Sequence, residues 1–258
     1  MRSVMVFFLL GFAGAFQWPA AVPASAEALS PAQRRPVVGL PDQAVASLPA
    51  APADPDKRPA LIVLLHGAGQ TPEQMIAIFE NDAACRNAVL LAPKSLGQTW
   101  DVVAMAIGRA MEASLSSDVL RYSSSKDAER VMSAISQLQQ TISTDPSRQV
   151  LVGFSDGATF ALALGTGRDR PFTAVVGLSP GLAVVPARAA PRRPVLVMHG
   201  RSDRSLSFDF TKGTIVPTLR GAGVKVEFVA FPGGHEIAAG AHGALAQLII
   251  GFGRDEER

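Results

Sequence analysis

Short aliphatic runs alternate with segments of helical periodicity along most of this chain. Such runs are typical of buried strands, and we expect strands at 61–65, 89–91, 149–154, 172–178, 194–198 and 225–231. Helical spacing is clearest at 125–142, and further helices are predicted at 71–81, 158–164, 208–220 and 238–252. This alternation predicts an α/β fold, in which a mostly parallel central sheet is covered by helices on both faces.

Two parts of the chain do not follow the alternation. Residues 27–58 are rich in Pro and Ala and lack periodicity, so we expect an irregular lead-in to a folded domain at 59–258. Residues 101–124 have no readable pattern either. A loop, short helices or a small cap over the site are all compatible with this second segment.

The N-terminus has the three parts of a secretory signal peptide. The chain begins with Met-Arg, an apolar run covers 4–16, and the small residues at 24–26 allow cleavage after Ala26. An uncleaved anchor is the alternative, but the run is shorter than the ~20 residues that a membrane span requires. We therefore expect residues 1–26 to be removed from an exported protein, periplasmic in a Gram-negative source, that keeps no stable membrane span.

The composition narrows the possible functions. The 258 residues carry a net charge of +2 without a basic run, which argues against nucleic-acid binding. The single cysteine, Cys85, excludes an internal disulfide, and we expect it to be a small buried hydrophobe. With four histidines, no paired cysteines and no HExxH motif, neither a zinc site nor another cofactor is expected, and the oligomeric state stays open.

Two stretches fit the pattern G-x-S-x-G, which forms a sharp strand-to-helix turn around a nucleophilic serine. The first, 153–157 around Ser155, follows a predicted strand and precedes a predicted helix, whose N-terminus favours developing negative charge. The second, 177–181 around Ser179, continues into Pro180, which has no N–H to donate to an oxyanion. We therefore predict Ser155 as the nucleophile and Ser179 as a residue at a strand end.

A serine nucleophile needs a base, which is usually a histidine held by a carboxylate. After this type of turn the acid comes next in the chain, and the histidine follows it. Asp203 and His235 each lie just after a predicted strand, at the sheet edge where ligands bind, and we predict them as acid and base. Asp209 is an alternative acid, although a helix N-terminal role explains it better.

The remaining histidines and nearby charges have simpler interpretations. His199 ends a predicted strand and is expected to be packed and hydrogen-bonded, whereas His242 falls in the last predicted helix and is expected at the surface. Arg201 and Arg204 flank the predicted acid, and we interpret them as solvated loop charges.

The oxyanion formed in acyl transfer needs two N–H donors. The residue after the nucleophile, Asp156, supplies the first donor. The second is predicted in the small-residue loop 66–69, where the N–H of Ala68 can face the same point. His66 is expected to brace this loop rather than to bind a metal.

These segments together resemble the α/β-hydrolase superfamily, and within it the phospholipase/carboxylesterase family and esterases related to polyhydroxybutyrate depolymerases. The resemblance extends from about residue 59 to the C-terminus. The matching motifs stand in family order: LLHGAG (64–69), LLAP (90–93), TWD (99–101), DPSR (145–148), VGFSDGA (152–158), LSPG (178–181), MHGRSD (198–203) and PGGH (232–235).

The resemblance implies the α/β-hydrolase fold and the roles already given for the predicted triad and oxyanion donors. It also implies that Trp100 lines the acyl or alcohol pocket, although a core tryptophan is equally compatible with the sequence. One departure concerns the loop of the acid, where the family often has a hydrophobic–proline pair and this chain has Leu206-Ser207.

These features predict an exported serine carboxylesterase that acts on small or polymeric esters without a cofactor. A polyester, feruloyl or acetyl esterase, or an acyltransferase, is the alternative on the same fold. A non-catalytic binding protein is less consistent with a serine, an aspartate and a histidine in this order.

Overall fold

The computed structural model describes residues 37–49, 57–82, 85–112, 120–122, 124–186, 188–189, 193–238, 240–241 and 243. The described residues all belong to one unit, Arg35–Arg258. The signal peptide predicted for 1–26 and nearly all of the helix predicted for 238–252 lie outside the described residues.

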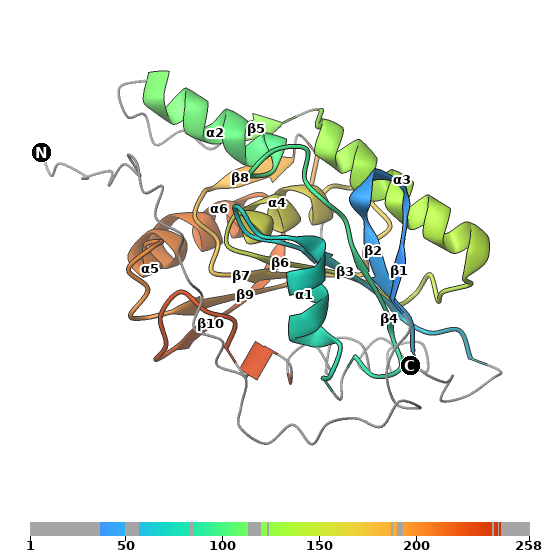
Figure 1. Cartoon of the computed structure of the whole chain (residues 1–258). Coiled ribbons are helices and arrows are strands. Elements are labelled where there is room, and N and C mark those ends of the chain that lie inside the picture. The colour runs from blue at the N-terminus through green and yellow to red at the C-terminus, as the bar shows by residue number, and fades with distance from the viewer. Residues whose placement is uncertain are drawn as a thin grey trace, which may run out of the picture. The chain divides into compact units, whose positions relative to one another are not determined.

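An eight-stranded sheet runs through this unit in the order β1-β2-β4-β3-β6-β7-β9-β10 (Figure 1). Its six consecutive strands from β4 to β10 are parallel, and β1 and β2 continue the sheet in antiparallel pairing. The strands are β1 Val37–Gly39, β2 Val45–Ser47, β3 Leu61–Leu65, β4 Val89–Ala92, β6 Gln149–Phe154, β7 Ala174–Leu178, β9 Pro194–Gly200 and β10 Lys225–Phe231.

Helices cover both faces of the sheet (Figure 1). On one face lies α1, whose Met75 and Phe79 pack with Ile62 and Leu64 of β3. On the other face α2, α3, α4 and α6 contribute buried residues to the larger core cluster, which also contains Val63 and Leu65 of β3. The helices are α1 Pro72–Phe79, α2 Asp101–Glu112, α3 Lys126–Thr141, α4 Asp156–Gly165, α5 Phe208–Phe210 and α6 Val216–Gly221.

The predicted α/β fold with a mostly parallel, doubly covered sheet is confirmed. Every residue of β3, β4, β6 and β7 is buried, as expected for strands with a helix layer on each side. Thr71 and Gln74 form a capping box, which explains why α1 begins at the predicted position. The helix predicted at 208–220 is helical from 208 to 221, but a π turn at Thr211–Ile215 joins α5 to α6.

The prediction of an irregular lead-in at 27–58 needs correction, because this segment contributes β1 and β2 to the sheet. Each strand has three residues, which is too short for a readable alternation, and a 3₁₀ turn beginning at Pro41 separates them. Val45 and Ala46 are buried, so β2 belongs to the sheet despite the Pro- and Ala-rich composition of the segment.

The unreadable segment 101–124 contains α2 and the short strand β5, Leu120–Tyr122. Val102, Val103 and Ala106 of α2 join the larger core cluster. β5 pairs with β8, Val184–Pro186, in a separate two-stranded parallel sheet. None of the helices in the described ranges combines the length and the hydropathy that a bilayer span requires.

Candidate active site

Ser155 occupies a strained turn between β6 and α4. Its backbone lies at φ 57° and ψ −120°, which residues with a side chain rarely adopt. Its N–H donates to the carbonyl oxygen of Leu178 at 2.9 Å, which holds the turn at the carboxyl end of β7. A Cβ at Gly153 would collide with the backbone of Gly157, and a Cβ at Gly157 would collide with the carbonyl of Leu65. Close backbone contacts therefore require both glycines of the motif.

The loops after β9 and β10 bring Asp203 and His235 to this serine. His235 Nε2 lies 3.0 Å from Ser155 Oγ, and His235 Nδ1 lies 2.7 Å from Asp203 Oδ2. The ring of Phe154 packs against the imidazole with a centroid separation of 4.9 Å. The three side chains predicted from sequence therefore meet in one hydrogen-bonded chain, with the arrangement that a Ser-His-Asp triad requires.

The carboxylate of Asp203 is buried and surrounded by donors. Oδ1 accepts the N–H groups of Ser205 and Leu206 at 2.8 and 2.9 Å, while Oδ2 faces His235 and, at 3.1 Å, His199 Nε2. Burial alone would raise the pKa of Asp203, but the hydrogen bonds from both histidines and from Leu206 hold it well below its usual range. Asp203 is therefore ionised at neutral pH.

His199 is fully buried, as predicted, but its contact with Asp203 was not predicted. Its ring also lies edge-on to Phe208, with centroids 6.0 Å apart. The signal available in the sequence is the spacing in HGRSD, because a side chain near the end of a strand and four positions before the acid can contact the acid.

The loop after β3 lies directly against the nucleophile. A Cβ built on Gly67 would stand 3.2 Å from the Cβ of Ser155. The N–H of Gly67 donates to Gln70 Oε1 at 2.8 Å, and the N–H of Gly69 donates to the carbonyl of Gln98 at 2.8 Å. These two bonds fix the path of the loop past the site.

Two backbone N–H groups beside Ser155 remain available for an incoming oxygen. In the part of the chain that the structure describes, the N–H groups of Ala68 and Asp156 make no hydrogen bond, and these are the two donors predicted from sequence. The carboxyl group of Asp156 instead accepts a 2.6 Å hydrogen bond from the Thr99 hydroxyl, a partner that the sequence did not identify. Burial raises the pKa of Asp156, and the Thr99 bond and nearby His235 only partly oppose this.

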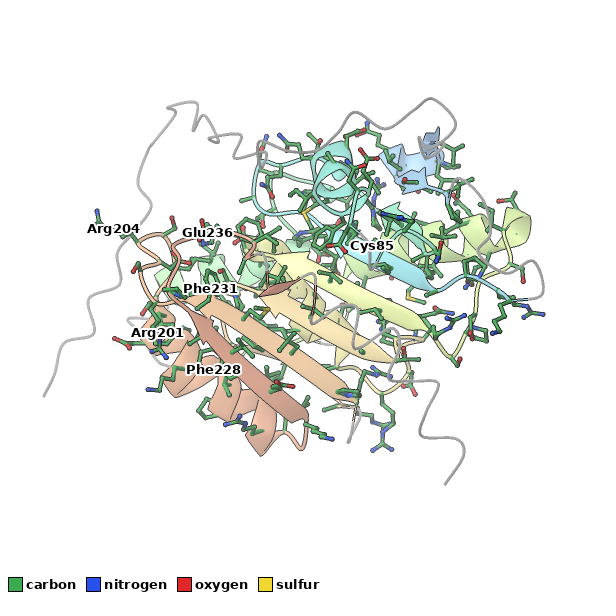
Figure 2. All side chains as sticks on the ribbon, turned by 90° about the horizontal axis from the view of Figure 1, so that it is seen from below. Cys85, Arg201, Arg204, Phe228, Phe231 and Glu236 are labelled. Carbon is green, nitrogen blue, oxygen red and sulfur yellow. The ribbon has the colours of Figure 1, made fainter. Side chains whose placement is uncertain are left out.

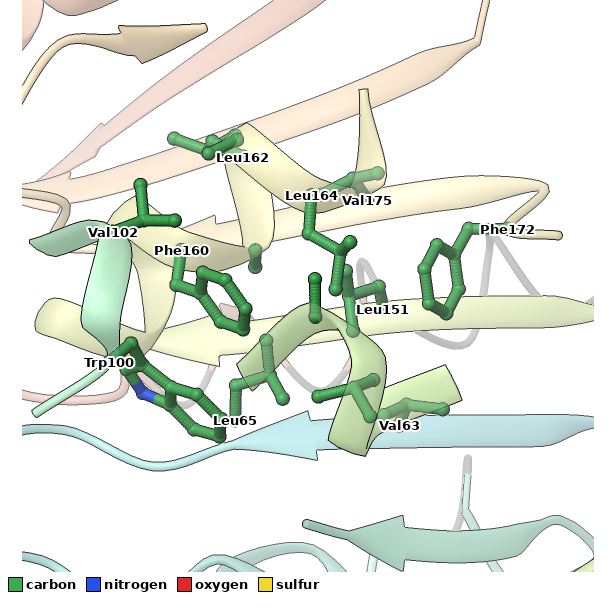
Figure 3. Packing of buried hydrophobic residues seen from close by; sticks show 14 of the residues in the cluster. Val63, Leu65, Trp100, Val102, Leu151, Phe160, Leu162, Leu164, Phe172 and Val175 are labelled. Atoms are coloured by element: carbon green, nitrogen blue, oxygen red, sulfur yellow. The ribbon is translucent and has the colours of Figure 1, made fainter. Parts of the chain in front are cut away.

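Trp100 lies in the core rather than in a pocket. It is fully buried, and its ring stacks on Phe160 with centroids 4.8 Å apart (Figure 3). Its indole N–H donates to the carbonyl oxygen of His66 at 2.8 Å, just before the oxyanion loop. The pocket role implied by resemblance is corrected accordingly, since this packing leaves Trp100 no surface that could touch a substrate.

His66 braces the oxyanion loop, as predicted. Its Nδ1–H donates to the carbonyl of Gly67 at 2.8 Å, and its Nε2 accepts the N–H of Ser95 at 3.2 Å. Burial lowers the pKa of His66 to about 4, against the opposing effect of the Gly67 hydrogen bond. The imidazole is therefore neutral near pH 7, with one proton fixed on Nδ1.

The competing candidates stand apart from this hydrogen-bonded chain. Ser179 is fully buried at φ 53°, and its hydroxyl makes no hydrogen bond within the described residues. Asp209 is exposed in the first turn of α5, as predicted for a helix N-terminal acid. Arg201 and Arg204 are exposed on the loop after β9, where Arg204 points away from the sheet (Figure 2). His242 lies outside the described residues.

Cys85 is buried, as predicted for a small hydrophobe. Across the described ranges, no group of three or more His, Cys, Asp or Glu side chains is arranged to hold a metal ion. The described site offers an activated hydroxyl, a base and two oxyanion donors.

Comparison with known proteins gives the chain a family context. The phospholipase/carboxylesterase family matches residues 49–249. NocK of Nocardia uniformis subsp. tsuyamanensis, which carries the name of an esterase, is 27% identical over 208 residues. That match covers 74% of this chain but 56% of NocK, so the chain spans little more than half of the length of this relative.

Solved structures share the fold at low sequence identity. SOBER1 of Arabidopsis thaliana superposes with a TM-score of 0.57 at 22% identity, and the match covers 76% of this chain and 99% of SOBER1. A phospholipase/carboxylesterase of Dyadobacter fermentans DSM 18053 gives 0.54 at 16% identity, with 84% and 96% covered. Esterase PE8 gives 0.56 at 19% identity, with 85% and 98% covered.

Proposed function

We propose that this chain, which belongs to the phospholipase/carboxylesterase family of α/β hydrolases, is an exported serine esterase that cleaves carboxylic esters. The observation that carries the proposal is the pair of hydrogen bonds joining Ser155 Oγ to His235 at 3.0 Å and His235 to Asp203 at 2.7 Å. A hydroxyl in this setting loses its proton to the imidazole as it attacks, which makes it an effective nucleophile.

In the acylation half, Ser155 Oγ attacks the ester carbonyl carbon while its proton moves to His235 Nε2. The carbonyl electron pair moves to the oxygen, which the N–H groups of Ala68 and Asp156 stabilise. When the tetrahedral adduct collapses, the bond to the alcohol oxygen breaks, and the alcohol leaves with the proton from His235. Asp203 stays ionised, keeps the proton of the resting imidazole on Nδ1 and stabilises the imidazolium.

In the deacylation half, His235 removes a proton from water as the water oxygen attacks the acyl group on Ser155. The oxyanion of the second tetrahedral adduct accepts hydrogen bonds from the same two N–H groups. Its collapse breaks the bond to Oγ, returns the proton from His235 to the serine and releases the carboxylic acid.

The direct test is Ser155→Ala, assayed with short-chain p-nitrophenyl esters. We expect kcat/KM to fall by at least about 10³-fold while thermal unfolding changes little. Ser179→Ala is the matched control, because Ser179 stands in the second G-x-S-x-G stretch and its buried hydroxyl has no partner among the described residues. Retained activity in Ser155→Ala would contradict the assignment of the nucleophile.

A fluorophosphonate probe tests the same serine without assuming a substrate. Wild-type protein should be labelled at Ser155, and Ser155→Ala should not be labelled at this position. Folded wild-type protein that resists the probe would favour the non-catalytic alternative. Esters graded by acyl length and bulk, polymeric esters and added alcohol acceptors then separate a general carboxylesterase from a polyester or feruloyl esterase and from an acyltransferase.

Export is supported by the signal-like N-terminal sequence, with its apolar run at 4–16 and small residues at 24–26. Expression of the full chain in a Gram-negative host, followed by mass determination of the periplasmic protein, tests the proposal. A mature chain beginning at Glu27 is the expected result, and an uncleaved chain in the cytoplasm would contradict it.

A further inference from the structure

We propose that His199 is a positioning residue for the triad, which holds the Asp203 carboxylate in place and limits how strongly that carboxylate stabilises protonated His235. The inference rests on the proposed serine-esterase function. His199 touches neither Ser155 nor the oxyanion donors in any described contact, so it would act only through Asp203.

The protonation of His199 follows from its two neighbours. Nε2 lies 3.1 Å from Asp203 Oδ2 and 3.2 Å from the carbonyl oxygen of Leu206. Both oxygens can only accept, since Asp203 is ionised, and Nε2 must therefore carry a proton that the two share. On the other side of the ring, Nδ1 is buried without a partner among the described residues.

His199 completes the set of donors around the carboxylate. An ionised carboxylate offers about four acceptor positions, and the contacts of Asp203 are Ser205 N, Leu206 N, His235 Nδ1 and His199 Nε2. Without the donor from His199, Oδ2 would be held by His235 alone. The carboxylate would then keep its hydrogen bond to His235 but orient the imidazole less tightly.

The rest of the structure holds His199 rigidly. The residue lies in β9 opposite Ala230 of β10, is completely buried and packs its ring against Phe208. Leu206 links the two side chains, because its N–H donates to Asp203 Oδ1 while its carbonyl oxygen faces His199 Nε2. His199 therefore fixes both the acid and the loop that carries it.

The charge balance at the base gives this role a measurable signature. Asp203 faces His235 from the loop after β9, and Asp156 acts on it from the start of α4. The adjacent Glu236 is exposed. Because a hydrogen bond from His199 draws negative charge away from His235, removing that bond should make the imidazolium more stable. Activity would then be lost at a higher pH on acidification than in the wild type.

The test compares His199→Gln with His199→Met. The Gln side chain can place an N–H where the ring Nε2 stands, whereas Met fills a similar volume without a donor. For His199→Met we expect kcat to fall by roughly 10–100-fold with little change in KM, and the acidic limb of kcat/KM to move to higher pH. For His199→Gln we expect both properties to return most of the way to wild type.

Arg204→Met is the matched control, because Arg204 is exposed beside Asp203 and should leave kcat and the acidic limb unchanged. If His199→Met does not fold, His199→Leu is compared with His199→Gln in the same way. Wild-type kcat and an unshifted acidic limb in the donor-free variant would overturn the inference, as would equal losses in the Gln and Met variants. Either result leaves the serine-esterase proposal intact, because Ser155→Ala and the fluorophosphonate probe test that proposal separately.

Discussion

Asp101 and Asp127 each accept the backbone N–H of the other, at 3.2 Å for Asp101 Oδ2 and 2.7 Å for Asp127 Oδ2. The two carboxylates lie at the N-termini of α2 and α3, where a negative charge also favours the helix dipole. Asp127 further accepts the N–H of Leu96 at 2.8 Å. The exchange ties α3 to the segment that carries Thr99, the partner of Asp156 at the site.

Asp127→Ala should therefore weaken both the fold and the site. It leaves the part-buried N–H groups of Leu96 and Asp101 without their acceptor, and a group that loses its partner away from water costs roughly 1–3 kcal/mol. We expect the free energy of unfolding, measured in urea, to fall by about 2–4 kcal/mol and kcat to fall with it. Glu129→Ala, an exposed change on the same helix, should stay within about 0.5 kcal/mol of wild type. Equal stability of the two variants would contradict the reciprocal capping.

Gly157→Ala should be among the most damaging small substitutions in the chain. The added methyl group would collide with the carbonyl oxygens of Leu65 and His66, which belong to a buried strand and the start of the oxyanion loop. Backbone atoms cannot move aside as a side chain can. We therefore expect the free energy of unfolding to fall by about 3 kcal/mol or more and esterase activity to be lost as well. Gly221→Ala provides the comparison, since open space surrounds that position at the end of α6. Thermal unfolding of both variants measures the difference, and a wild-type midpoint for Gly157→Ala would refute the close contact.

Trp100→Phe should separate packing from positioning. A phenyl ring can keep most of the contact with Phe160, but it cannot donate to the carbonyl of His66. We expect a stability loss of about 1–3 kcal/mol for the unpaired carbonyl and a decrease in kcat larger than any change in KM, because the oxyanion loop loses a support. Steady-state kinetics with one p-nitrophenyl ester would measure the changes in kcat and KM. A stability loss with unchanged kcat would mean that the bond holds only the core.

Those parts of the fold that depend on local pattern could be predicted from the sequence. The aliphatic run at 61–65 and the glycines around Ser155 specify a buried strand and a tight turn without reference to distant residues. The positions of Asp203 and His235 followed from the same logic, because parallel strands end at one edge of the sheet. For β1 and β2 the local signal fails, since three residues are too few to show a period.

The contacts missed from the sequence depend on how separate segments fit together in three dimensions. Thr99 and Asp156 are 57 positions apart, and their hydrogen bond depends on how the segment before α2 passes the start of α4. The role of Trp100 depends on whether its ring faces the site or Phe160. No pattern of residues in the sequence specifies this orientation. His199 likewise reaches the triad residue Asp203 only because the acid loop turns back toward the strand that carries His199.

The burial of His66 should make the folded protein less stable in mild acid. Its pKa is about 4 in the folded protein because the ring is buried, against an ordinary value of 6.5 in an unfolded chain. As the pH falls below about 6.5, the unfolded chain therefore takes up a proton that the folded protein does not. This favours unfolding, so the contribution of His66 to stability is complete above pH 6.5 and is progressively lost down to about pH 4.

The size of this effect can be measured with His66→Gln, in which a side-chain oxygen can still accept the N–H of Ser95 but nothing titrates in this range. Between pH 7.5 and pH 5 the wild type should lose about 2 kcal/mol more of its unfolding free energy than the variant. The other histidines are present in both proteins, so their titrations cancel in the comparison. Parallel pH profiles would mean that the folded protein accepts a proton at His66 as readily as the unfolded chain does, and that this ring is not the neutral brace of the oxyanion loop.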